Sequence, residues 1–326
     1  MSTVTQQAGP ASPAGSAGPL SGRRPLGDRT FQVITLAAGL LVLVILILIA
    51  FSTTQQAAPW FKAEGWGIFG TTWNPASNQF GALAFIYGTA ITAVIALIMA
   101  VPVSVAIALL LTEVVPYRWA RPIVYVIDLL AVVPSVVWGL WGILVFAPWI
   151  AKIYAGIGSA VTGIPVLDSL FGPPTSGASF FTAGIILAFM ITPIVTSLSR
   201  EVIATVPAID KEGAYALGAT RLEMITGAVW PHSKGGIVGA VLLGLGRAMG
   251  ETIAVALVIG SSATITSHLF APGDSMPAVI ANQFGEAAGV FRAGLIGLGV
   301  LLFAFTIIVN IIARAIVGRS AEQGSA

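Results

Sequence analysis

Residues 31–51 read FQVITLAAGLLVLVILILIAF and contain no charged side chain. About 20 apolar residues are enough for a helix to cross the roughly 30 Å hydrocarbon core of a bilayer. Three arginines, Arg23, Arg24 and Arg29, precede this run. Its apolar core is longer than that of a cleaved signal peptide. We therefore predict an uncleaved first transmembrane helix.

The rest of the chain has the same apolar character. Of its 326 residues, 56% are hydrophobic and only 9% are charged, which is too little charge to cover a soluble protein of this size. The apolar blocks are also too long for the alternating strands of a membrane barrel. The sequence therefore predicts an all-α, polytopic membrane protein with six transmembrane helices. The expected spans are residues 31–53, 83–111, 121–146, 180–199, 236–261 and 294–317.

Basic residues indicate the topology. With six spans, most of the 15 Lys and Arg residues lie in loops on the side of the N-terminus, so the positive-inside rule places both termini in the cytoplasm. Residues 1–30, rich in Ala, Gly, Pro and Ser, read as a disordered cytoplasmic tail. Residues 31–319 form the transmembrane domain, with a cytoplasmic loop at 200–236, and 320–326 form a cytoplasmic C-terminal tail.

Composition excludes several functions. The chain has no cysteine, so it has no disulfide and no thiolate metal site, and we expect no metal centre. The net charge of +2 is spread over loops and does not indicate nucleic-acid binding. No Gly-Lys dipeptide is present, so the chain lacks the phosphate-binding loop of an ATPase. No histidine lies in a predicted span, which disfavours an intramembrane hydrolase. We expect a protein without enzymatic activity.

The long cytoplasmic loop contains signals for two short helices. Pro207 suits the first turn of a helix, and Gly218 suits its end. Thr220 and Glu223 have the spacing of a capping box that begins a second helix. We expect Pro231 to limit that second helix. The loop should therefore form a compact helical hairpin.

One motif in this loop resembles the E-A-A-x3-G-x9-I-x-L-P loop of ABC importer permeases. Its positions in this chain are Glu212, Gly213, Ala214, Gly218 and Pro231. Gly213, Ala228 and Trp230 depart from the first Ala, the Ile and the Leu of the motif. The resemblance implies the type I ABC importer permease fold. It also implies that the loop is a coupling helix docked on a separate ATPase, which would bind ATP and Mg²⁺ in place of this chain.

Two further stretches are similar to PstC, a family of permease subunits of phosphate importers. They are DLLAVVPSVVWGLWG at 128–142 and GRAMGET at 246–252. This resemblance implies a bacterial inner or plasma membrane location and inorganic phosphate as the substrate. It implies as partners a second, related permease (PstA-like), two ATPase copies (PstB-like) and an external phosphate-binding protein (PstS-like). PstA and PstC are themselves related, so only resemblance separates their roles.

Two charges lie inside the predicted fifth span. Arg247 and Glu251 have i, i+4 spacing, which places them on one helix face where they partly neutralise each other. Each charge costs about 2.5–3.5 kcal/mol at the centre of a membrane, so both should face the bundle interior or a wet path. We expect Arg247 to bind an oxyanion in transit. Glu251 would limit that attraction, and Thr252 would lie on the same path. A buried ion pair that only fixes helix register is the alternative.

Three residues of the other stretch have structural or path roles. Asp128 lies about 10 Å along the helix from Arg121, close enough to reach toward the cytoplasmic interface, and we favour a structural hydrogen-bonding role for it. Pro134 should kink its span, and Ser135 follows it.

Some alternatives stay open at this point. The substrate could be another oxyanion, such as sulfate or molybdate, or the chain could be a secondary anion transporter. Segment 55–80 could fold back on the bundle or contact an external partner.

Overall fold

The computed structural model describes residues 26–172 and 176–322. The chain divides into two units, residues 1–51 and 52–326. In the first unit the described part belongs to α1 (Leu26–Glu64), and its large apolar side chains from Phe31 to Phe51 are exposed, as lipid contact requires. α1 begins at Leu26, so the last five residues of the predicted tail are helical. Residues 1–25 of that tail lie outside the described residues.

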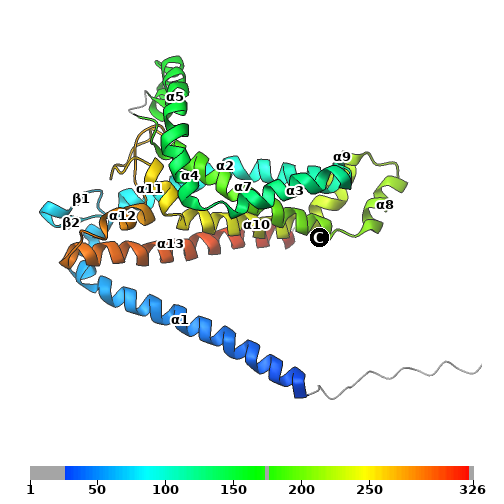
Figure 1. Ribbon diagram of the computed structural model, residues 1–326, viewed down its shortest axis with the longest axis horizontal. Helices are drawn as coiled ribbons and strands as arrows, with labels where there is room; N and C mark the ends of the chain where they lie inside the picture. The colour runs from blue at the N-terminus through cyan, green and yellow to red at the C-terminus, as the bar shows by residue number, and fades with distance from the viewer. Residues whose placement is uncertain (1–25, 173–175, 323–326) are drawn as a thin grey trace, which may run out of the picture. The chain divides into compact units, whose positions relative to one another are not determined.

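Five long helices form the bundle of the second unit. They run alongside one another in Figure 1, and α7 contacts α2, α3 and α10, while α10 also contacts α13. Glycines allow the backbones to approach: Gly236 faces Val202, and Gly244 faces Val195. The five helices are α2 (Leu83–Leu109), α3 (Tyr117–Val132), α7 (Phe180–Ala204), α10 (Trp230–Gly250) and α13 (Gly289–Glu322).

Shorter elements connect these helices. The strands β1 and β2 pair as a two-residue antiparallel hairpin. The 3₁₀ turns are η1 (Gly65–Phe69) and η2 (Pro75–Ser77), and the strands are β1 (Trp73–Asn74) and β2 (Gln79–Phe80). The π turns are η3 (Leu110–Val114), η4 (Gly142–Phe146) and η5 (Ile225–Val229). The short helices are α4 (Ser135–Trp141), α5 (Ala147–Val161), α6 (Pro165–Phe171), α8 (Ala208–Ala216), α9 (Arg221–Met224), α11 (Ile253–Val258) and α12 (Met276–Gln283).

The helical membrane fold predicted from the sequence is confirmed. Five helical segments among the described residues are long and apolar enough to cross a membrane. These segments are Arg29–Phe69, Leu83–Val114, Ser135–Val161, Phe180–Ala204 and Gly289–Ala315. The predicted fifth span, 236–261, is not among them, because a break after Gly250 divides it into α10 and α11. α13 continues to Glu322 and so includes the first residues of the predicted C-terminal tail.

The predicted third span, 121–146, is wrong as a single helix. α3 ends at Val132, and Val133 and Pro134 are extended, with ψ of 124° and 140°. A proline ring disfavours helical backbone in the residue before it and supplies no N–H of its own. Pro134 therefore breaks the helix instead of kinking it. α3 lies along the bundle, whereas α4 and α5 run steeply across its direction (Figure 1).

Segment 55–80 folds back on the bundle. The Trp60 side chain is fully buried and its Nε1 donates to the carbonyl oxygen of Phe80 at 3.0 Å. Gly297 of α13 gives the Trp60 ring room to pack. Trp73 Nε1 donates to Gln283 Oε1 at 3.0 Å. Tryptophans in external segments usually anchor at the interface, but Trp60 is part of the protein core.

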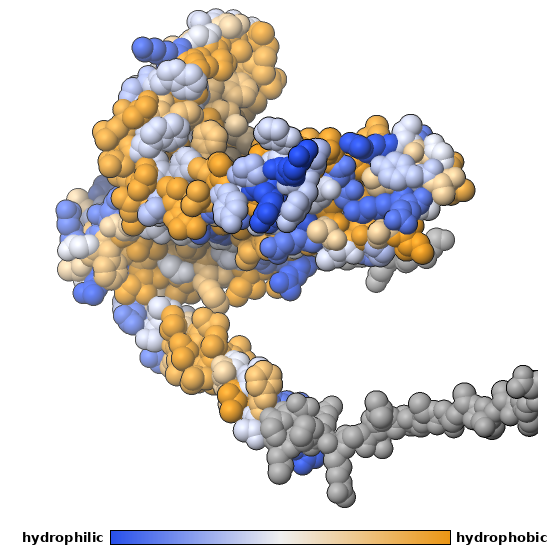
Figure 2. Space-filling model, turned by 45° about the vertical axis from the view of Figure 1, so that its right-hand side comes forward, coloured by the Kyte–Doolittle hydropathy of each residue, from blue (hydrophilic) through white to orange (hydrophobic). Residues whose placement is uncertain are grey.

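The surface follows the expected membrane pattern. Apolar side chains cover much of the visible face, and hydrophilic side chains gather toward the end that carries α8 and α9 (Figure 2). The main buried cluster lies between α2, α7, α10 and α11, with Phe180, Ile186, Ile191, Met249 and Val255 among its members. This packing fixes the positions of α10, which carries Arg247, and of α11, which follows Glu251.

Candidate functional site

The loop at 200–236 forms the predicted pair of short helices. α8 begins after Pro207 and is followed by Gly218, whose φ of +85° is in the left-handed region that favours glycine. Thr220 Oγ1 accepts from the backbone N–H of Glu223 at 3.4 Å, and Glu223 Oε2 accepts from the N–H of Thr220 at 2.7 Å. The capping box is confirmed. The carboxyl of Glu223 accepts from the Thr220 backbone N–H and, at 2.8 Å, from the Thr220 hydroxyl, and these two hydrogen bonds lower its pKa. We call residues 208–224 the hairpin.

The prediction that Pro231 ends the second helix is wrong. The π turn η5 joins α9 directly to α10, and Pro231 lies in the first turn of α10. The N–H of Trp230 bonds to the carbonyl of Ile225, five residues back. This wider turn accommodates a proline that has no N–H of its own. The backbone is therefore helical without interruption from Arg221 to Gly250.

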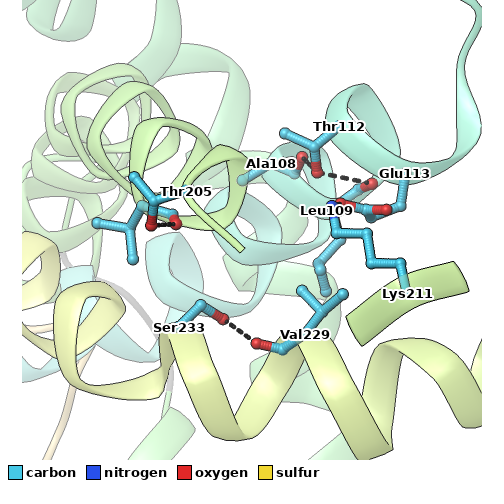
Figure 3. A network of polar contacts seen from close by, with 9 residues as sticks. Ala108, Leu109, Thr112, Glu113, Thr205, Lys211, Val229 and Ser233 are labelled. Atoms are coloured by element: carbon cyan, nitrogen blue, oxygen red, sulfur yellow. Dashed lines mark hydrogen bonds and ion pairs between the residues drawn. The ribbon is translucent and has the colours of Figure 1, made fainter. Parts of the chain in front are cut away.

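An ion pair and a small apolar core hold the base of the hairpin. Lys211 Nζ lies 2.6 Å from Glu113 Oε1, which joins α8 to η3 (Figure 3). Beside this ion pair Ala108, Ile203, Val206, Met224, Val229 and Ile237 form a buried cluster. The sequence did not indicate this ion pair, because its two members lie on separate segments 98 residues apart.

The outer face of the hairpin exposes large apolar side chains. Leu217 is 92% exposed, Ile209 75% and Leu222 71%. Of the motif residues, Glu212 is exposed beside this face, whereas Ala214 packs against the buried cluster at the base. Exposed apolar residues at the hydrophilic end of a membrane protein are typical of a docking surface. The hairpin therefore offers an apolar face on a firmly held base.

Arg247 and Glu251 do not share one helix face. α10 ends at Gly250, and Glu251 has extended backbone with ψ of 125°. The Glu251 carboxylate instead turns to α11, where Oε1 accepts from the N–H of Ala254 at 3.4 Å. Thr252 Oγ1 donates to the carbonyl of Gly250 at 3.2 Å. The predicted i, i+4 geometry is wrong, and among the described residues Arg247 has no carboxylate within 4.0 Å.

Arg247 is exposed at a groove between α10 and α13. The groove has a volume of about 1060 Å³ and is mostly apolar, with Thr306 and Asn310 as neutral polar groups and Arg314 as a second cation. Gly235, Gly239 and Gly246 of α10 also line it. None of the described lining residues is acidic. The sequence did not predict that α13 would contribute Asn310 and Arg314, because they lie on a helix distant in the chain.

The structure brings together the ends of the two stretches that resemble PstC, 128–142 and 246–252. Gly139 of α4 packs against Ala254 of α11, directly after the break at Glu251. Ser135 is the first residue of α4, next to the break at Pro134. Asp128 lies elsewhere: it is exposed at a separate cleft near α8. It makes no hydrogen bond with any described residue, so the structure gives no support to a structural hydrogen-bonding role.

Asp274 is a buried acid that the sequence did not single out. Burial raises the pKa of its carboxyl from an ordinary value of 3.8 to about 6, against one backbone hydrogen bond from Ser275 at 2.8 Å. The chain at Pro272–Ser275 is clamped between α2 and α7, where Gly88 and Gly273 leave room for it. In the sequence Asp274 reads as an ordinary turn residue.

The substitution Asp274→Asn should stabilise the protein at alkaline pH. The folded state binds the Asp274 proton more tightly than the unfolded chain does, so stability declines as pH rises from 3.8 to about 6 and stays low above that. A neutral amide at this position would remove a cost of about 3 kcal/mol at pH 8 and almost none at pH 4. Thermal unfolding of the purified protein at both pH values measures this. An equal gain at both would contradict a charge effect.

The chain is similar in sequence to a family of transport proteins and to several of its named members. Residues 100–321 match the family model described as binding-protein-dependent transport system inner membrane component. The chain is 43% identical to the phosphate transport system permease protein PstC of Mesorhizobium japonicum, with 90% of each chain covered. It is 42% identical to PstC of Xylella fastidiosa, over 91% of this chain and 93% of the relative. It is 36% identical to the probable PstC of Methanocaldococcus jannaschii, over 86% and 91%.

Solved structures show the same fold at low identity. A chain of a bacterial alginate ABC transporter in complex with its pentasaccharide-bound periplasmic protein superposes with a TM-score of 0.58 at 16% identity, over 91% of this chain and 98% of that one. A chain of the MetNI methionine ABC transporter superposes with a TM-score of 0.50 at 14% identity, over 74% and 99%.

Proposed function

Because the chain belongs to the family of binding-protein-dependent transport system inner membrane components, we propose that it is the transmembrane permease subunit of an ATP-driven phosphate importer. Its similarity over nearly the whole chain to proteins named as phosphate transport permeases carries this proposal. The exposed Arg247 at the α10–α13 groove also supports this proposal, because a guanidinium can bind phosphate oxygens. The chain would lie in a bacterial inner or plasma membrane with both termini in the cytoplasm.

The substrate path would run along the groove between α10 and α13, closed by a second, related permease of the PstA type. The Arg247 guanidinium can form two parallel hydrogen bonds with phosphate oxygens. Glu251 and Thr252 lie at the break, four and five residues further along. The negative charge of Glu251 would weaken the hold on phosphate enough for release. A helix break within a membrane, such as the one at Glu251, is tolerated where protein or water satisfies the freed backbone groups.

The hairpin would couple this chain to the ATPase. Glu212, Gly213, Ala214 and Gly218 belong to it, and the exposed apolar face of Leu217 and Leu222 suits a protein cleft. The π turn η5, just before Pro231, joins the hairpin to α10. The other partners would be two PstB-like ATPase copies and an external PstS-like phosphate-binding protein. ATP and Mg²⁺ would bind to the ATPase, and we assign no catalytic residue to this chain.

An ATPase assay on the complex tests this function. The complex purified through this chain and reconstituted in lipid should hydrolyse ATP faster when the external binding protein and phosphate are both present, by about tenfold or more over either alone. Stimulation by sulfate or molybdate in place of phosphate would contradict the substrate. Purification without any ATPase, with uptake driven by an ion gradient, would instead indicate a secondary anion transporter.

A further inference from the structure

A second cleft, beside the hairpin, plays no part in the proposed transport path. It has a volume of about 690 Å³ and lies where η3, α3 and the end of α7 meet α8. Its charged residues are Glu113, Arg121, Asp128, Arg200 and Lys211. We call it the basal cleft. A cleft with this many ionisable groups at one end of a membrane bundle is a candidate binding site.

Two guanidinium groups of the cleft have no acidic partner among the described residues. Lys211 and Glu113 neutralise each other, because Nζ and Oε1 are 2.6 Å apart. Among the described residues, neither Arg121 nor Arg200 has a carboxylate within 4.0 Å. Arg200 is half-buried, so its guanidinium loses hydration without gaining a counter-charge from the chain. The cleft therefore has unbalanced positive charge that an anion would neutralise.

The exposed Arg121 side chain lies against an aromatic ring. Its Cζ lies over the Tyr117 ring, 5.4 Å from the centroid, a cation–π contact that limits its rotation. Tyr125 also lines the cleft and provides a hydroxyl donor. Both tyrosines and Trp119 are exposed on α3, as in an aromatic belt at a membrane interface. Basic clefts between transmembrane helices at the cytoplasmic side bind phosphate head groups.

Asp128 makes the charge differ between the two ends of the cleft. It lies on α3 seven residues after Arg121, about 10 Å along the helix, so along α3 the Arg121 cation and the Asp128 carboxylate lie toward opposite ends of the cleft. An anion at the arginine end feels net attraction, whereas one at the other end is repelled by Asp128. The cleft therefore favours an anion near Arg121 over one near Asp128.

We propose that the basal cleft binds a phosphate-bearing anion between Arg121 and Arg200. Planar guanidinium groups match phosphate oxygens in a bidentate manner. Two sources supply this chemistry, the head group of an anionic lipid and free inorganic phosphate in the cytoplasm. Lys211 lines the same cleft and is tied to Glu113, so a bound anion contacts the base of the hairpin.

A lipid arm tests the first source. The assembled complex is reconstituted in nanodiscs of phosphatidylcholine and phosphatidylglycerol, and lipids retained after detergent exchange are counted by native mass spectrometry. The double variant Arg121→Gln/Arg200→Gln should retain phosphatidylglycerol at least tenfold less than the unmodified protein. Arg118→Gln, an exposed arginine on the same helix outside the cleft, should retain it fully.

A phosphate arm tests the second source. Binding of ³²P-phosphate is measured in detergent without anionic lipid, in an Arg247→Gln background that removes the proposed path site. Binding that persists in this background and falls at least tenfold on adding Arg121→Gln/Arg200→Gln assigns the cleft to free phosphate. The same Arg118→Gln control should leave it unchanged.

The proposal is overturned if the double variant matches the Arg118→Gln control in both arms. If the double variant does not assemble, Asp128→Asn provides the second test. Removing the negative charge of Asp128, which repels the anion, should raise the affinity at least threefold in whichever of the two experiments detects binding. An unchanged or lower affinity overturns the proposal. Neither arm depends on transport, so loss of the proposed transport function is detected separately.

Discussion

Replacing Arg247 by glutamine should reduce phosphate uptake to background while the complex still assembles. Arg247 lies exposed at the α10–α13 groove, and no carboxylate of the described residues lies within 4.0 Å to share its charge. Losing two charge-assisted hydrogen bonds, each about 1.5–3 kcal/mol, predicts a decrease of at least 100-fold. Uptake of ³²P-phosphate in cells lacking the native permease measures the loss, and co-purification of the ATPase reports assembly.

Two control variants make this result specific. Arg247→Lys keeps the charge but not the planar fork, so we expect it to retain part of the uptake. Arg118→Gln removes an exposed arginine outside the groove and should leave uptake unchanged. Normal uptake by Arg247→Gln would refute the role of this residue and would point to another part of the groove.

Placing aspartates on the outer face of the hairpin should uncouple the ATPase. In the variant Leu217→Asp/Leu222→Asp, two side chains that are 92% and 71% exposed become charged without disturbing the buried base. If this face docks in an apolar cleft, burying two unpaired carboxylates there costs several kcal/mol. We expect the ATPase to be absent from the purified complex and uptake to be lost.

The matched control is Leu217→Met/Leu222→Met. It keeps the face apolar with little change in volume, so the ATPase should co-purify at the normal level. Circular dichroism of both variants should be unchanged, because neither side chain belongs to the buried cluster at the base. Retention of the ATPase by the aspartate variant would place the docking surface elsewhere.

The hairpin could be predicted in detail because its signals are local. Pro207, Gly218, and the pair Thr220 and Glu223 each act through backbone conformation or hydrogen bonds within three residues. The same holds for the apolar blocks, whose length alone indicates membrane helices. These features needed no knowledge of what packs against them.

The two helix breaks could not be predicted because they depend on tertiary contacts. Pro134 indicated a distortion, but whether a helix kinks or stops depends on what receives the freed carbonyls. At Glu251 no proline marks the position. The break is held by the carboxylate accepting from Ala254 and by Gly139 packing against the same residue. The first contact spans only three residues, but the second joins α4 to α11 and cannot be seen before the fold is known.

The continuous helix from Arg221 to Gly250 has a mechanical consequence. It begins in the hairpin, passes Pro231 through the π turn, and ends one turn after Arg247, a distance of about 40 Å. A continuous helix transmits a tilt or translation over its full length. A displacement applied to the hairpin by a docked ATPase would therefore move the Arg247 guanidinium directly. The break at Glu251 leaves α11 outside that helix. A force applied at the hairpin end would therefore change how Arg247 faces its ligand while α11 stays in place.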